Sequence, residues 1–154
     1  MLLWHYELST PLGPMRAGFD GRGRLRELIL EAPNPRQTTP LPPQEQREAK
    51  HFLDRQVAAY LAGTLQTFTV PIDPQGTAQA VRIWDAVRTI PYGQSREPRE
   101  LAAWLGLEEA PVVMACAANP ILLLIPAHRV VLPGEGPIPR ALRQLEAGAV
   151  WQKP

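Results

Sequence analysis

The chain has 154 residues, enough for one ordinary domain or two small ones. Its 45% hydrophobic and 20% charged residues are typical of a globular protein, and no run of about 18 apolar residues predicts a transmembrane helix. The net charge of +1 excludes a chain that is basic throughout, so any nucleic-acid site must be a local patch.

The first part of the chain predicts an antiparallel sheet followed by a helix. Alternating apolar residues and turn-forming sequences indicate strands at 2–9, 16–20 and 24–32, with turns at 10–15 and 20–23. The proline-rich segment 33–43 cannot sustain a helix or a central strand. The spacing of Phe52, Leu53, Val57, Tyr60 and Leu61 then predicts an amphipathic helix over 44–63.

The second half predicts mainly helices. The segment 71–77 has two prolines and a glycine, and it is the best candidate for a boundary between domains. Helices are expected at 81–87, 98–106, 110–118 and 139–151. The tight turn 106–109 between two of them fits a helix-turn-helix, and it also fits a helical hairpin with no function. Spacing alone leaves both interpretations open.

The stretch "ILLLIPAHRVV", 121–131, is interpreted as a core strand that delivers polar groups to a site. His128 could act as a general base near neutral pH. The residue beside it, where a cysteine or serine nucleophile would be expected, is Ala127, whose methyl group cannot react. Spacing alone favours another interpretation, in which His128 is a core histidine bonded to the backbone and Arg129 ties two loops together.

The segment "NPILLLIPAHRVV" resembles the active-site segment of the O6-alkylguanine-DNA alkyltransferases, in which a cysteine stands at the position of Ala127. Further segments are similar to the same family: "STPLGPMRAGFD", "VPIDPQGT", "IWDAVRTIPYG" and "ELAAWLG". The resemblance covers nearly the whole chain. Loss of the cysteine within this frame is typical of the alkyltransferase-like proteins, which bind O6-alkylguanine without repairing it.

The resemblance implies an α+β fold. An N-terminal antiparallel-sheet domain of ribonuclease H-like type is expected at 1–70, a linker at 71–77, and a helical domain at 78–154 with a helix-turn-helix or winged-helix-like DNA-binding unit. The implied function is non-catalytic: the protein flips an O6-alkylguanine of double-stranded DNA into a pocket and hands it to damage-recognition proteins of nucleotide excision repair. Flipping costs a few kcal/mol, which pocket and groove contacts can offset.

The resemblance also assigns residues to the site. The lesion pocket would consist of Asn119, Pro126, Ala127, His128, Arg129 and Val130, with His128 as the former general base. The DNA-binding residues would be Tyr92, Gly93, Arg96, Arg99, Ala110, Val113 and Ala117. The helix 110–118 would enter the minor groove, for which small side chains are suited.

Several positions depart from the family pattern. Pro98 stands where the family has a tyrosine that turns the target phosphate, and Ala110 where it has an intercalating arginine. The exposed carboxylates expected at Glu108 and Glu109 would repel phosphates. The loop 132–141 is shorter than usual, which predicts a more open pocket for bulkier alkyl groups. The family's glutamate at the end of the hydrogen-bond chain corresponds to Ala147 or, shifted by one residue, to Glu146.

Two alternatives follow from the same residues. Cys116 lies three residues before Asn119 and could serve as a substitute acceptor, although a lone cysteine in an alanine-rich helix is usually inert. The missing tyrosine and arginine also allow an interaction module that has lost DNA binding. One cysteine and three scattered histidines predict no metal, and no cofactor is expected. The start of the chain lacks a secretory signal, so the expected location is cytoplasmic, away from membranes.

Overall fold

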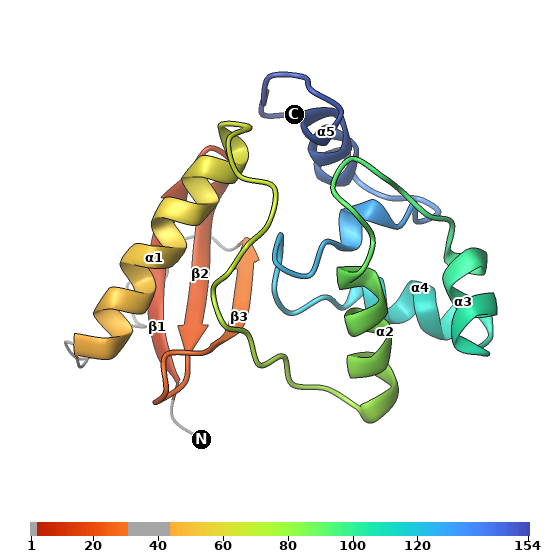
Figure 1. The fold of residues 1–154 in the computed structure, drawn as a ribbon, viewed down its shortest axis with the longest axis horizontal. Helices are drawn as coiled ribbons and strands as arrows, with labels where there is room; N and C mark the ends of the chain where they lie inside the picture. Colours follow the sequence, from red (N-terminus) through yellow and green to blue (C-terminus); the bar gives the residue numbers. More distant parts are fainter. Residues whose placement is uncertain (1–2, 31–43) are drawn as a thin grey trace. The chain divides into compact units, whose positions relative to one another are not determined.

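The computed structural model describes residues 3–30 and 44–154. The chain divides into two compact units, Met1–Pro74 and Gln75–Pro154, and the division lies within the segment 71–77. Figure 1 shows a sheet with one helix in the first unit and a set of helices in the second. The fold is α+β, with an N-terminal antiparallel sheet and a helical C-terminal part.

The first unit contains a sheet of order β1-β2-β3 in which both pairs are antiparallel. Its strands are β1 (Trp4–Thr10), β2 (Gly13–Phe19) and β3 (Leu25–Leu30). Met15, Ala17 and Phe19 of β2 alternate onto the buried face, as the period of two in a strand requires. A register shift between Gly18 and Phe19 adds an irregularity near the end of the ladder.

The turn between β1 and β2 is shorter than the sequence predicts. The prediction assigned residues 10–15 to the turn, but β2 begins at Gly13, so only two residues connect the strands. Gly13 has a φ of 120°, which glycine adopts without steric cost. The Thr10 hydroxyl donates to the Gly13 carbonyl oxygen at 2.8 Å and accepts from the Leu12 amide at 3.2 Å, which closes the tight turn.

Helix α1 (Gln44–Leu61) packs on the sheet of the first unit (Figure 1). Its buried residues Leu53, Val57 and Tyr60 follow the helical period, which confirms the predicted amphipathic helix. The Gln56 side chain of α1 accepts from the Thr69 backbone nitrogen at 2.9 Å and donates to the Thr69 hydroxyl at 2.7 Å. These bonds hold the chain that leaves α1 against the first unit.

The second unit consists of α2 (Ala78–Arg88), α3 (Pro98–Leu105), α4 (Glu109–Ala117), a 3-10 turn at Ala127–Arg129 and α5 (Pro137–Glu146). Thr77 caps α2 by accepting from the Ala80 amide, and Gly106 ends α3 with a φ of 69°. Helices α2, α3 and α4 pack against one another, and α5 packs on the 3-10 turn. The four predicted helices are present, although α5 ends at Glu146, earlier than predicted.

The prediction of a core strand over 121–131 is wrong. All residues of the second unit are described, and none of them forms a strand; 119–130 instead follows turns and the 3-10 helix. Pro120 and Pro126 lack backbone donors, and Asn119 offers the backbone local partners in place of a ladder. The aliphatic run is nevertheless buried, because it fills the core around Ile121 and Ile125.

No helix among the described residues is long and apolar enough to cross a membrane.

Candidate DNA-lesion site

The segment 119–130 is shaped by the side chain of Asn119. Its amide nitrogen donates to the Ile125 carbonyl oxygen at 2.8 Å, and its amide oxygen accepts from the Ile121 backbone nitrogen at 3.0 Å. Within this loop Leu123 adopts a φ of 72°, a left-handed conformation that is uncommon outside glycine. Asn119 therefore joins the end of α4 to the loop that leads to Ala127.

Beyond the loop, the 3-10 turn presents Ala127 and buries its two neighbours. Ala127 is half-buried, whereas His128 and Arg129 are 5% and 8% exposed. The backbone on either side of Val130 is tied to the segment just before α3, because the Arg96 backbone nitrogen donates to the Arg129 carbonyl and the Arg96 carbonyl accepts from the Val131 amide. The methyl group of Ala127 is thus partly accessible, whereas the side chains of His128 and Arg129 are buried.

The centre of this polar cluster is the carboxylate of Glu146 at the end of α5. It accepts from His128 Nε2 at 2.6 Å, from Arg129 Nε at 2.9 Å and from the Gly93 backbone nitrogen at 3.0 Å. Arg129 adds a second nitrogen at 3.1 Å, so that its guanidinium binds the carboxylate in a bidentate manner. Arg129 also donates to the Ile90 carbonyl and lies over the Tyr92 ring. One buried ion pair therefore connects α5, the 3-10 turn and the loop after α2.

The surroundings of His128 favour its neutral form. Burial lowers the pKa of its imidazole below the ordinary value of 6.5, and the charges of Arg129 and Arg143 act in the same direction; the hydrogen bond and charge of Glu146 oppose them without reversing the shift. To donate a hydrogen bond to the carboxylate, a neutral ring must carry its single proton on the nitrogen that faces the carboxylate. The Nε2–H tautomer is therefore the one that fits the 2.6 Å bond to Glu146.

The helix pair α3 and α4 carries most residues predicted to bind DNA. Ala110 and Ala117 are exposed and Val113 is half-buried, on the outer side of α4. Arg99 is exposed on α3, whereas the Arg96 guanidinium bonds the Ser95 carbonyl and the Gln94 side chain. Gly93 has a φ of 80° and uses its backbone nitrogen to bind Glu146, so its role in the structure is to support the polar cluster.

Cys116 lies on the inner side of α4. It is 4% exposed, and burial raises the pKa of its thiol to about 11. At neutral pH such a thiol is almost entirely protonated and is a weak nucleophile. Asn119 lies beyond the end of α4, and the Cys116 side chain points into the core.

Comparison with known proteins identifies the family. Residues 78–150 match the family described as "6-O-methylguanine DNA methyltransferase, DNA binding domain". A methylated-DNA–protein-cysteine methyltransferase of Methanosarcina acetivorans is 31% identical over 131 residues, covering 84% of this chain and 83% of the relative. The chain belongs to the O6-methylguanine-DNA methyltransferase family.

Solved structures of this family share the fold of both parts of the chain. The O6-methylguanine methyltransferase of Mycobacterium tuberculosis matches with a TM-score of 0.79 at 31% identity, over 95% of this chain and 93% of the other. A structure of the same organism's protein in complex with DNA matches with a TM-score of 0.79 at 32% identity, over 93% and 92%. The family likeness therefore extends beyond the active-site segment.

The structure shows which of the two candidate residues bonds to His128. The sequence left Glu146 and Ala147 as alternatives; Glu146 is buried against His128, whereas Ala147 is exposed and caps the end of α5. Of the residues predicted to line the lesion pocket, Asn119 and Ala127 are partly exposed, while the remaining four, Pro126, His128, Arg129 and Val130, are buried. Their part in lesion binding remains a prediction. In the structure they form the buried surroundings of Ala127.

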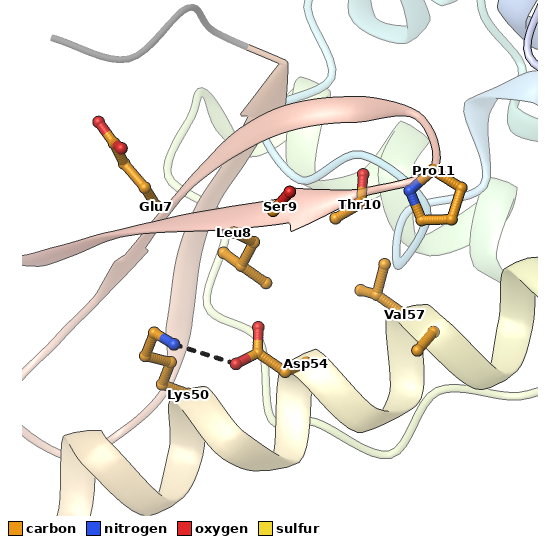
Figure 2. Close-up of a pocket in the computed structure, with 9 residues that line it drawn as sticks. Glu7, Leu8, Ser9, Thr10, Pro11, Lys50, Asp54 and Val57 are labelled. Carbon is orange, nitrogen blue, oxygen red and sulfur yellow. Dashed lines mark hydrogen bonds and ion pairs between the residues drawn. The ribbon is translucent and has the colours of Figure 1, made fainter.

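Two hollows lie elsewhere in the units. Figure 2 shows one of about 170 Å³ in the first unit, between β1 and α1, where Lys50 and Asp54 form an ion pair at 3.0 Å. Glu7 also lines this hollow, so its charged side chains are two carboxylates and one ammonium group. A second, of about 420 Å³, lies beside α3 and includes Arg96, Glu100 and Trp104. Among the described residues no group of three or more His, Cys, Asp or Glu side chains could hold a metal ion.

Proposed function

We propose that this protein binds O6-alkylated guanine in double-stranded DNA without accepting the alkyl group. The observation that carries the proposal is Ala127, which occupies the accessible position on the 3-10 turn beside a buried His128–Glu146 pair. Transfer of an alkyl group would require a side-chain atom with a lone pair to attack the carbon, and a methyl group has none. The frame that would activate a nucleophile is kept while the nucleophile is absent.

DNA binding is supported by the family and by the helix pair α3–α4. A relative with the same fold crystallised in complex with DNA, and the family match covers residues 78–150. Ala110, Val113 and Ala117 on the outer face of α4 have small, uncharged side chains, which suit the narrow minor groove. Binding of a flipped base requires only that pocket and groove contacts exceed the cost of unstacking.

Because the lesion would remain in the DNA, a second step is needed for repair. We propose that the bound complex is passed to damage-recognition proteins of nucleotide excision repair. A long-lived complex that leaves the alkyl group in place is a suitable mark for such proteins, whereas a transferase would erase the lesion.

Alkyl transfer through Cys116 is the second candidate. The named activity of the relatives, methylated-DNA–protein-cysteine methyltransferase, favours it. The position of the thiol argues against it, since Cys116 is buried and its pKa is raised to about 11. For transfer, α4 would have to open enough to expose a side chain that packs in the core.

The test combines binding with mass spectrometry. Fluorescence anisotropy compares duplexes that carry guanine or O6-methylguanine at one position, and intact-mass measurement follows on the same samples. We expect tighter binding of the lesion duplex, an unchanged protein mass and unrepaired DNA. A methyl adduct that disappears in Cys116→Ala would establish the transferase instead, and equal, weak binding of both duplexes without transfer would favour an interaction module.

A further inference from the structure

The outer face of α4 is uncharged and is centred on a methionine. Val112, Ala115 and Cys116 are buried on the inner side of the helix. At 100° per residue, the opposite side carries Ala110, Met114 and Ala117, with Val113 at its edge. Met114 is 70% exposed and lies four residues after Ala110 and three before Ala117, so these three side chains share one surface.

Met114 projects beyond the rest of this surface. Its nearest neighbours on the outer face are alanines, whose side chains end at Cβ, while methionine extends three heavy atoms further. The thioether is unbranched and polarizable, so it can adapt to a flat, irregular apolar partner. An exposed methionine on a helix of small residues is therefore the one long apolar group that α4 offers to a groove.

We infer that Met114 inserts into the DNA from the minor groove as an apolar wedge beside the flipped base. The inference rests on the proposed function, because it requires α4 to lie in the groove. Proteins that bind the minor groove commonly insert apolar side chains between base steps and so hold the bases apart. When a guanine leaves the stack, the faces of its neighbours become exposed to water, and the methionine side chain covers them.

Apolar insertion provides α4 with a DNA contact, since its charged residues do not attract phosphates. Glu108 and Glu109 precede the outer face and are exposed, so the beginning of the helix repels phosphates. Contacts along α4 must therefore come from shape and apolar burial. Met114 supplies both at the centre of the face, where Ala110 and Ala117 let the helix backbone approach closely.

The experiment uses the full chain and a duplex with 2-aminopurine next to O6-methylguanine, at one fixed salt concentration. Loss of stacking raises 2-aminopurine fluorescence, and anisotropy of a separate end label gives the affinity. We expect Met114→Ala to bind the lesion duplex roughly tenfold more weakly, since it removes most of one apolar side chain from the interface. It should also reduce the 2-aminopurine signal at saturating protein, and Met114→Leu should restore most of both.

The control is Val150→Ala, which shortens an apolar side chain that is 85% exposed and lies beyond α5. It should change neither readout. Met114→Ala should fold normally, because alanine is the best helix former and the position is exposed. Thermal melts of both variants verify this.

The outcomes separate the wedge from the proposed function. If the wild-type chain prefers the lesion duplex and Met114→Ala matches it in affinity and fluorescence, the wedge is overturned and lesion binding stands. If Met114→Ala weakens binding with the 2-aminopurine signal unchanged, Met114 is an ordinary groove contact, and the wedge is again overturned. If the wild-type chain does not bind duplexes, the proposed function fails and the wedge fails with it.

Discussion

At the residue scale, the stability of the candidate site depends on the carboxylate of Glu146. Removal of this group leaves the guanidinium of Arg129 buried without its counter-charge, and it also removes an acceptor from His128 and Gly93. We expect Glu146→Ala to lower the free energy of unfolding by about 3–5 kcal/mol, the usual cost of breaking a buried ion pair. Urea denaturation measures this change.

The matched control for Glu146 is Gln144→Ala on the same helix. Gln144 is exposed, so its truncation should alter stability by less than about 0.5 kcal/mol. A loss at Glu146 as small as that at Gln144 would mean that the buried pair contributes no net stability.

His128 makes stability depend on pH. Its pKa is lowered in the folded state, mainly by burial, so between that value and about 6.5 the unfolded chain binds a proton that the folded chain does not. Stability therefore falls as the pH falls below about 6.5, by at most about 1.4 kcal/mol per pH unit. Unfolding of the wild type and His128→Gln at pH 7.5 and 5.5 tests this: the wild type should lose more stability than the variant. Parallel losses would assign the effect to other groups.

Restoring a thiol at position 127 tests the idea that only the nucleophile is missing. In Ala127→Cys, on a Cys116→Ala background, the single thiol would stand at the half-exposed position beside His128, which Glu146 holds at 2.6 Å. We expect the variant to accept up to one methyl group per chain from an O6-methylguanine duplex, as seen by intact mass. Ala117→Cys on the same background, an exposed thiol without a histidine neighbour in sequence, should accept none.

Failure of Ala127→Cys would be informative when binding is intact. A variant that still prefers the lesion duplex but gains no mass would show that the preserved His128–Glu146 pair does not suffice for transfer. The departures at Pro98 and Ala110 would then have to be considered together with Ala127.

At the element scale, the loop 119–126 depends on one side chain. Outside a helix or sheet, the loop obtains two of its backbone hydrogen bonds from the Asn119 side chain, at the Ile121 amide and the Ile125 carbonyl. We expect Asn119→Ala to destabilise the fold by about 1–3 kcal/mol, since the Ile121 amide loses its acceptor and the Ile125 carbonyl keeps only the Ala127 amide as a donor, and to weaken lesion binding by displacing Ala127. Chemical denaturation and anisotropy measure the two effects; Asn119→Asp keeps the acceptor for Ile121 but turns a carboxylate oxygen toward the Ile125 carbonyl oxygen, so it should not regain the stability of the wild type. Unchanged lesion binding in a destabilised Asn119→Ala would separate the loop from the site.

The helices and hairpins were predictable because their signals are local. Pro98 at the start of α3 and Gly106 at its end mark boundaries that the structure keeps, whereas α2 begins at Ala78, three residues before the predicted start. The run 121–125 has no such signal: five aliphatic residues fit a buried strand and a buried loop equally well, and only the absence of a partner strand in the second unit decides between them. Strand formation depends on a neighbour, which a single segment cannot reveal.

The candidate site was predictable in its position along the chain but not in its long-range contacts. The sequence motif 126–129 located the candidate site. The choice between Glu146 and Ala147 depended on which residue of α5 faces His128, and this cannot be read from the sequence. Met114 was not predicted as a DNA-binding residue, although its spacing of four residues from Ala110 places both on the same face of the helix. The outer face of a helix becomes visible once its buried face is known, and here Val112, Ala115 and Cys116 define it.

At the scale of the whole molecule, charge is nearly balanced. The net charge is +1, and the residues predicted to bind DNA include only two cations, Arg96 and Arg99. Proteins that bind DNA mainly through phosphates release many counterions and show steep salt dependence. Under the proposed function, so few cations among the predicted contacts mean that most of the affinity should come from the pocket and the apolar face of α4.

This balance predicts a shallow dependence of affinity on salt. With about two phosphate contacts, the slope of log K against log salt should be near −2, so that a rise from about 50 to 200 mM salt weakens binding roughly tenfold to twentyfold. Arg99→Ala should weaken binding to both duplexes and flatten the slope by about one, while the preference for O6-methylguanine is kept. Anisotropy titrations at four salt concentrations provide the slopes. A slope several units steeper would mean that other exposed arginines carry the binding, and a preference lost with Arg99 would place this residue at the lesion itself.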